Sequence, residues 1–315
     1  MRTASFRRPA LGLRLATAVV AGLVLGLVAW LAPVFERQVA PSAPAATSEE
    51  PAGVAHSPSH PMLFFDERAF AAAEAVTAVT PVEPMPGARG LLLPHHWVGG
   101  VFITTPLRDL AASRQVRRVI LIGPNHTNAG SGAVLSSDLA WETPFGWAEA
   151  DRAAVAALAA SGSARLEPEV LTYEHSVAGI VPAVRRYLPE AQVIPIIFRG
   201  GLSAEDVSRL ATALAPLMDE GTVMVAAVDF SHGLPASAAR QRDGETLAML
   251  RAFNWAPLLQ WGNEHLDSPA SVAVLVETMS RLGAGRFELR ANSNSGEVAG
   301  DPASPVTSYI VGYFH

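Results

Sequence analysis

The stretch Arg117–Thr127, which reads RRVILIGPNHT, decides the fold that we predict for this chain. Val119–Ile122 is a short apolar run rich in β-branched residues, as expected for a strand buried on both faces of a parallel sheet. Gly123-Pro124-Asn125 then predicts a turn. His126 therefore follows the carboxyl end of a buried strand, where open α/β sheets place their ligands and their chemistry.

Two further histidine motifs repeat this arrangement. Pro94-His95-His96 follows the apolar run Leu91–Leu93, and Asp229-Phe230-Ser231-His232 follows the apolar run Val223–Val228. A single loop histidine is more often only hydrogen-bonded to the backbone. Three strand-like runs that each end in histidine are difficult to explain by packing alone, and they indicate a functional site at the strand ends.

Helical and strand-like segments alternate along the rest of the chain. Helices are predicted at residues 69–78, 107–114, 148–160, 174–188, 203–217, 236–253 and 268–282, and further strands at residues 193–198, 286–290 and 308–314. Alternation of strands with helices of this length is typical of α/β proteins. The predicted fold is a three-layer α/β/α sandwich around a mostly parallel mixed sheet, with an N-terminal transmembrane helix.

Composition narrows the possible functions. The chain has 315 residues, of which 50% are hydrophobic, and a formal net charge of -6. Because the globular part shows no basic patch, we expect no nucleic-acid partner. The chain contains no cysteine, which excludes thiolate metal sites and cysteine nucleophiles. Any metal must therefore be held by nitrogen and oxygen ligands.

The N-terminal region carries a membrane signal. Several arginines precede an unbroken apolar stretch at residues 15–35, which is long enough to cross a hydrocarbon core of about 30 Å as a helix. Arginines on the leading side predict that the remainder of the chain lies outside the cytoplasm. A cleaved signal peptide is the alternative, because Ala43-Pro44-Ala45 has a small-x-small pattern.

Three regions follow from this reading. Residues 1–37 are predicted to be a transmembrane anchor or signal, residues 38–62 a disordered linker rich in Pro, Ala and Ser, and residues 63–315 the globular domain. His56 and His60 fall in the linker and receive no predicted role.

The ordered motifs PHH, GPNHT, EHS, DFSH and DSP, with the terminal run TSYIVGYF, resemble the Memo family, which includes the bacterial AmmeMemoRadiSam system protein B. The resemblance covers roughly residues 91–314. Members of that family share a fold with the extradiol catechol dioxygenases, in which two histidines and a carboxylate hold a non-haem iron. The resemblance therefore implies a metal-binding, dioxygenase-like oxidoreductase with a small-molecule substrate, such as an aromatic compound.

Carried over to this sequence, the resemblance makes His95 and His126 the two metal histidines. Animal members use a cysteine as a further ligand, and this chain has none at the matching segment. Asp267 is the expected replacement, with His265 and Glu264 as alternatives. Two imidazoles and a carboxylate suit ferrous iron, which is the expected cofactor, although copper and zinc also bind imidazole.

The same resemblance implies catalytic roles for His232, Asp229 and His175. His232 matches the acid/base histidine of the dioxygenases, and Asp229, which starts the same motif, could orient its ring or raise its pKa. Glu174 and His175 match a pair near the pocket, with His175 beside the metal or facing the substrate rather than ligating.

Two other function classes remain to be weighed. A pocket that binds a metal or peptide without turnover is the main alternative, because a shared fold does not establish function. A Ser-His-Asp hydrolase built from the DFSH segment is disfavoured, since neighbouring residues point to alternate sides and no G-x-S-x-G motif is present. The substrate and the oligomeric state are left open by the sequence.

Overall fold

A computed structural model describes residues 58–301 and 305–315. Its strands form one sheet in the order β4-β3-β5-β2-β6-β1-β9-β7, with β8 paired to β9. The strand bounds are β1 Gly90–Leu93, β2 Arg118–Pro124, β3 Val134–Ser136, β4 Arg165–Leu166, β5 Gln192–Phe198, β6 Thr222–Ala227, β7 His232–Leu234, β8 Phe287–Asn294 and β9 Val306–Phe314. The α/β fold and the mixed sheet that the sequence predicts are confirmed.

The centre of the sheet is parallel, and an antiparallel pairing borders it on each side. β5, β2, β6 and β1 run parallel to one another. β3 pairs antiparallel with β5, and β9 pairs antiparallel with β1, β7 and β8. Because the four central strands point the same way, the loops that follow β1, β2 and β6 leave one edge of the sheet together.

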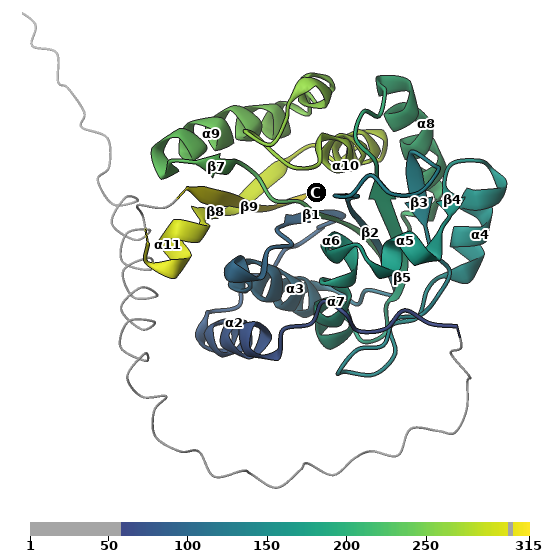
Figure 1. The fold of residues 1–315 in the computed structure, drawn as a ribbon, viewed down its shortest axis with the longest axis horizontal. Coiled ribbons are helices and arrows are strands. Elements are labelled where there is room, and N and C mark those ends of the chain that lie inside the picture. The colour runs from purple at the N-terminus through teal and green to yellow at the C-terminus, as the bar shows by residue number, and fades with distance from the viewer. Residues whose placement is uncertain (1–57, 302–304) are drawn as a thin grey trace, which may run out of the picture. The chain divides into compact units, whose positions relative to one another are not determined.

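Helices flank both faces of the sheet (Figure 1). Alternate residues of β2 point to opposite faces, as a strand requires. Ile120 and Ile122 pack in the core shared with α8, α9 and α10, whereas Val119 and Leu121 pack in the core shared with α3, α6 and α7. The helix bounds are α2 Glu67–Val79, α3 Val101–Ser113, α4 Arg152–Ala160, α5 Pro168–Thr172, α6 His175–Ala178, α7 Val181–Tyr187, α8 Ala204–Leu214, α9 Ala236–Ala252, α10 Pro269–Arg281 and α11 Ser295–Ala299.

The predicted helix at residues 174–188 is divided in two. α6 ends at Ala178, and α7 starts at Val181 with Pro182 in its first turn. Proline has no backbone N–H, so Pro182 cannot donate to the carbonyl of Ala178, and a continuous helix would lose that bond. The break leaves α6 as a single turn whose N-terminus lies beside the end of β2.

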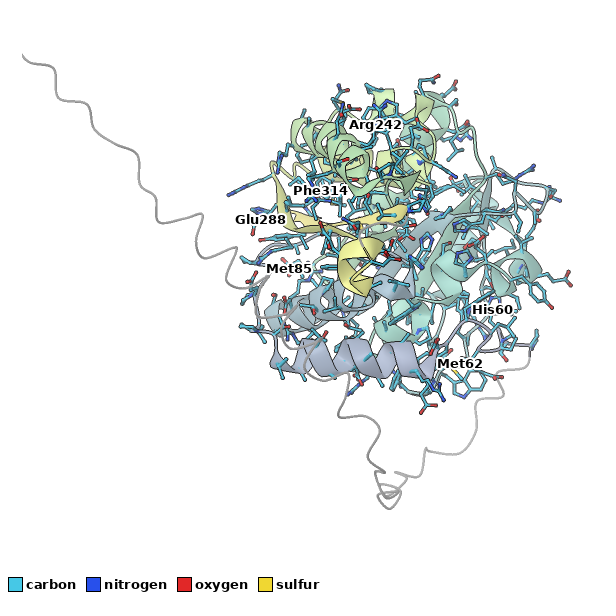
Figure 2. All side chains as sticks on the ribbon, turned by 60° about the vertical axis from the view of Figure 1, so that its left-hand side comes forward. His60, Met62, Met85, Arg242, Glu288 and Phe314 are labelled. Carbon is cyan, nitrogen blue, oxygen red and sulfur yellow. The ribbon has the colours of Figure 1, made fainter. Side chains whose placement is uncertain are left out.

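The domain begins before the predicted residue 63. His60, which is labelled in Figure 2, is buried. Its backbone N–H donates to the carbonyl of Ala140, and its ring stacks on Trp141. Residues 58–62 therefore belong to the domain rather than to the linker. The predicted anchor and most of the predicted linker lie outside the described residues. Within residues 58–301 and 305–315, no helix has both the length and the apolar character needed to span a bilayer.

Candidate metal centre

Three neighbouring strands deliver the predicted site residues to one edge of the sheet. His95 lies two residues beyond β1, His126 two residues beyond β2, and Asp229 two residues beyond β6. The structure brings the rings of His95 and His126 together, with 5.0 Å between their centroids. The parallel pairing of the central strands explains this meeting, because their carboxyl ends share one edge.

Asp267 reaches the same point from the loop before α10. Its backbone N–H donates to the carbonyl of Asp229 at 3.0 Å, and Phe230 forms a bridge with Leu266. Its Oδ2 lies 3.4 Å from His95 Nε2 and 3.7 Å from His126 Nε2. Both oxygens of this buried carboxylate have no hydrogen-bond partner. A buried carboxylate in that condition is costly unless a cation completes its surroundings.

Hydrogen bonds orient both histidines toward Asp267. His95 Nδ1 lies 3.2 Å from the carbonyl of Ala227, to which it donates. His126 Nδ1 lies 2.8 Å from Glu174 Oε1. When a carbonyl or carboxylate accepts a hydrogen bond from Nδ1–H, the proton stays on Nδ1 and Nε2 carries the free electron pair. Both Nε2 atoms are thus presented to the space in front of Asp267, which is the tautomer a metal ligand needs.

Glu174 is the organising carboxylate of the site. It is buried, it caps α6 by accepting from the Ser176 backbone, and it also accepts from the His126 backbone N–H at 2.7 Å. Burial by itself would raise the pKa of Glu174, but the bonds from His126 and Ser176 lower it to about 2. Gly123 permits this packing, because a Cβ there would lie 2.8 Å from Ser176 Oγ.

The two carboxylates create a strong demand for positive charge at His126. Burial would lower the pKa of His126, but Asp267 and Glu174 outweigh it and raise the pKa to about 10. The site therefore favours a cation at this position, as a proton or as a metal ion that displaces it.

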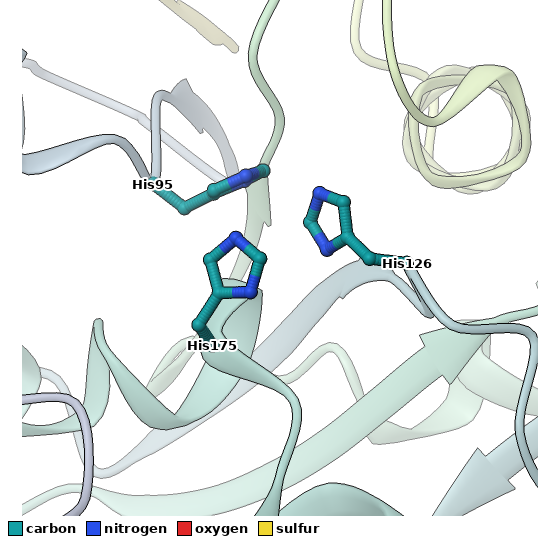
Figure 3. Close-up of side chains that lie close together, drawn as sticks. All are labelled: His95, His126 and His175. Carbon is teal, nitrogen blue, oxygen red and sulfur yellow. The ribbon is translucent and has the colours of Figure 1, made fainter.

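His175 is the third imidazole of the cluster. Its ring stacks on that of His126 at 4.2 Å and meets that of His95 edge-on at 5.2 Å. Figure 3 shows the three rings turned toward one another. Burial and the neighbouring histidines lower the pKa of His175 to about 4, which keeps it neutral. The sequence predicted His175 near the site but not as a metal ligand. In the structure its donor atom lies within 4.8 Å of those of His95 and His126.

Asp229 holds the His95 loop rather than the ring of His232. Its Oδ1 accepts from the backbone N–H groups of His95 and His96, at 3.1 and 3.4 Å. Its Oδ2 lies 3.7 Å from His95 Nε2. His232 lines the same cavity, yet its buried Nδ1 has no hydrogen-bond partner. The orientation of His232 by Asp229 that the motif suggested therefore does not occur through that nitrogen.

The remaining motif residues have other partners. His265 lies against Glu245, with 2.8 Å between His265 Nε2 and Glu245 Oε2, and its ring stacks on Trp261. Neither it nor the half-exposed Glu264 lies among the donors that surround His95. Ser231 Oγ donates to Asp243 at 3.2 Å, so it is not the nucleophile of a triad with His232.

One contact near the site could not be foreseen. His96 Nδ1 lies 2.9 Å from the hydroxyl of Tyr309, a buried residue of β9 more than two hundred positions later in the chain. Burial lowers the pKa of His96. In the sequence, His96 was marked only as the second histidine of the PHH motif, and nothing there indicated Tyr309 as its partner.

A cavity of about 460 Å³ opens onto the cluster. Five histidines and Asp229 line it, and Phe64, Trp97 and Thr307 complete its wall. The ring of Phe64 lies 6.0 Å from that of His175. A polar, nitrogen-rich floor beside two aromatic side chains suits a small ligand that has a metal-binding group and a planar apolar part.

The donors fit a divalent metal. Among the residues that the structure describes, two groups have donor atoms within 4.8 Å of one another: His95 with His126 and His175, and His95 with Asp229 and Asp267. Imidazole and carboxylate suit iron, copper and zinc. The oxygens of Asp267 make no hydrogen bond, and Oδ2 lies 3.4 and 3.7 Å from the two Nε2 atoms, an arrangement that a cation would complete.

The sequence comparisons point to one protein family. The family described as Memo-like protein matches residues 57–313. A MEMO1 family protein of Methanopyrus kandleri is 26% identical over 234 residues, which are 71% of this chain and 81% of that protein. A MEMO1 family protein of Methanosarcina barkeri is 32% identical over 202 residues, which are 62% and 73% of the two chains. The crystal structure of an uncharacterized protein from Escherichia coli K12 aligns with 71% of this chain and 99% of its own, at a TM-score of 0.48 and 13% identity.

Proposed function

This chain belongs to the Memo-like protein family, and on that basis we propose that it binds a divalent metal, ferrous iron in the active form, and acts as a dioxygenase-like oxidoreductase on small aromatic substrates. His95, His126 and Asp267 are the proposed ligands. His232 is the proposed acid/base. Asp229 holds the loop that carries His95, and the ring of His175 packs on that of His126.

One observation carries the metal-binding part of the proposal. The partnerless carboxylate of Asp267 faces two imidazoles whose Nδ1 atoms are already engaged, by Ala227 and by Glu174. Both lone pairs and the carboxylate thus face one space, and partners of this kind at Nδ1 are what fix metal-binding histidines. Asp267 and Glu174 together favour positive charge between the rings, which a metal ion would supply.

The oxidoreductase part rests on the cavity. Iron held by two imidazoles and a carboxylate would supply oxygen activation. Phe64 and Trp97 would hold the ring of an aromatic substrate. His232 lines the same cavity and would take a substrate hydroxyl proton and later return it, the role that histidine most often has in general acid–base catalysis.

The test is oxygen consumption by the ferrous-loaded full-length protein with a series of substituted catechols. We expect turnover in the wild type, and a loss of roughly 10²–10⁴-fold in His232→Ala with unchanged metal content, since this is the usual contribution of a general acid/base. His315→Ala, outside the cavity, is the matched control. Loss of metal from His232→Ala would make His232 a ligand, and absence of turnover with every diol would contradict the oxidoreductase function.

One observation favours a second candidate, a protein that binds a metal and a ligand without turnover. General bases are ordinarily oriented by a third group, yet His232 Nδ1 has no hydrogen-bond partner. In such a protein, His232→Ala would leave metal content unchanged, and the wild type would consume no oxygen with any diol.

A further inference from the structure

We propose that His175 is an additional metal-binding residue, and that the third ligand of the site depends on the cation: His175 completes a three-imidazole set for nitrogen-preferring Cu²⁺ and Zn²⁺, whereas Asp267 completes the set for oxygen-preferring Mn²⁺ and Fe²⁺. The inference rests on the proposed metal site, of which His95 and His126 remain the common ligands.

The position of the donors supports two alternative third ligands. The donor atoms of His175, His95 and His126 lie within 4.8 Å of one another. Asp267 lies 3.4 and 3.7 Å from the Nε2 atoms of His95 and His126. The side chain of His175 is 47% exposed and that of Asp267 only 5%. The pair of histidines therefore has an imidazole toward the cavity mouth and a carboxylate toward the interior.

One carboxylate lies beside both imidazoles on the cavity side. Glu174 Oε1 lies 2.8 Å from His126 Nδ1 and 3.5 Å from His175 Nδ1. Because each ring turns its Nδ1 to the same oxygen, each has Nε2 left for an ion. This is the arrangement by which carboxylates prepare histidines for metal binding.

Closure of the three-imidazole set requires a modest movement. Nitrogen ligands of a tetrahedral ion stand roughly 3.4 Å apart, given metal–nitrogen bonds of about 2.0–2.1 Å. His175 can make that movement, because it follows the N-cap of the single-turn helix α6. Its half-exposed ring is held by ring contacts with His126, His95 and Phe64 and by the long contact to Glu174. Asp267 cannot leave its place as easily, since its backbone is bonded to Asp229.

Ligand chemistry then decides which residue is used. Imidazole suits copper and zinc, and carboxylate suits manganese and other harder cations. Asp229 is the weaker candidate for the oxygen-rich set, because its Oδ1 already accepts two backbone N–H groups.

The experiment measures the affinity of the full-length protein for Zn²⁺ and for Mn²⁺, by competition with a chelator, in the wild type, His175→Ala and Asp267→Asn. We expect His175→Ala to weaken Zn²⁺ binding at least about tenfold, because even outer partners of a metal are worth 10–100-fold, and to change Mn²⁺ binding by less than about threefold. Asp267→Asn should show the reverse order. His96→Ala is the matched control, since His96 lines the same cavity but belongs to neither donor group.

Electron paramagnetic resonance of the Cu²⁺-loaded protein gives a second readout. The nitrogen hyperfine pattern should report three imidazoles in the wild type and two in His175→Ala. Two imidazoles in both proteins, or a Zn²⁺ affinity that falls no further in His175→Ala than in His96→Ala, would overturn this inference and leave the metal site standing. Binding of no cation by the wild type would instead contradict the proposed function itself.

Discussion

Glu174 shows how much a single residue can determine at this site. This buried carboxylate accepts hydrogen bonds from the Nδ1 and the backbone N–H of His126, and it caps α6 by accepting from the backbone N–H of Ser176. It links the end of β2 to the helix that carries His175. A side chain that serves three donors at once is sensitive to the loss of one oxygen.

We predict that Glu174→Gln lowers metal affinity by roughly 10–100-fold, the usual effect of removing a carboxylate behind a metal histidine. Glutamine has one acceptor oxygen, so it cannot serve the His126 ring and two backbone N–H groups together. Chelator competition measures the change. Glu264→Gln, which replaces an exposed carboxylate three residues before Asp267, is the control. Equal affinities in the two variants would show that Glu174 does not act on the metal.

At the residue scale, the sequence predicted which side chains would meet and not how they would be bonded. His95, His126 and Asp229 follow parallel strands, so their convergence is a consequence of strand order. Asp229 accepts from the backbone of the His95 loop, which depends on its side-chain rotamer. His96 contacts the hydroxyl of Tyr309, which lies on an antiparallel strand late in the chain. Such contacts depend on packing that no local pattern encodes.

The segment before α2 is the part of the domain that was predicted least well from the sequence. A run of Pro, Ser and His resembles the linker that precedes it, yet residues 58–62 are fixed by His60. His60 Nδ1 lies 2.7 Å from Thr172 Oγ1, and His60 Nε2 lies 2.7 Å from Ser137 Oγ. Thr172 donates its own hydroxyl proton to Pro168, so His60 Nδ1 is the donor and Nε2 accepts from Ser137. The neutral imidazole is therefore the form that fits.

This contact predicts a pH-dependent stability. Burial lowers the pKa of His60 from 6.5 to about 4. Between these values the unfolded chain binds the proton and the folded chain does not, so the contribution of His60 is complete above pH 6.5 and is lost as the pH falls toward 4. The shift corresponds to about 3 kcal/mol at most.

Denaturant unfolding of the wild type and His60→Ala at several pH values measures this contribution. The difference in unfolding free energy between the two proteins should be largest near pH 7.5 and shrink toward pH 4.5. A difference that stays constant with pH would show that His60 stabilises the segment by packing on Trp141 alone.

Other elements show where local patterns are sufficient. The strands that precede His95 and His126 and the helix capped by Ser268 were predicted within a few residues, because buried apolar runs and capping residues are local signals. The short strands β3, β4 and β7 were missed, since their pairing depends on distant partners. Pro182 signalled the break between α6 and α7, but the amphipathic pattern of the segment concealed it.

At the scale of the whole molecule, the location of the domain is a separate proposal. We propose that the apolar stretch at residues 15–35 anchors the chain, with the Memo-like domain outside the cytoplasm. Protease added to cells with a permeabilised outer layer should then digest the domain, while the undigested protein pellets with membranes. Protection of the domain would reverse the topology, and a mature N-terminus near Ala46 would show a cleaved signal.

The central claim is that His95 and His126 hold one divalent metal together with a carboxylate. Its most direct test is the metal content of full-length protein purified anaerobically, measured by elemental analysis in the wild type, His95→Ala, His126→Ala and the control His315→Ala. The account predicts one metal ion per chain in the wild type and the control, and none in the two cavity variants, with unchanged circular dichroism in all four. Unchanged metal content in both His95→Ala and His126→Ala would contradict it.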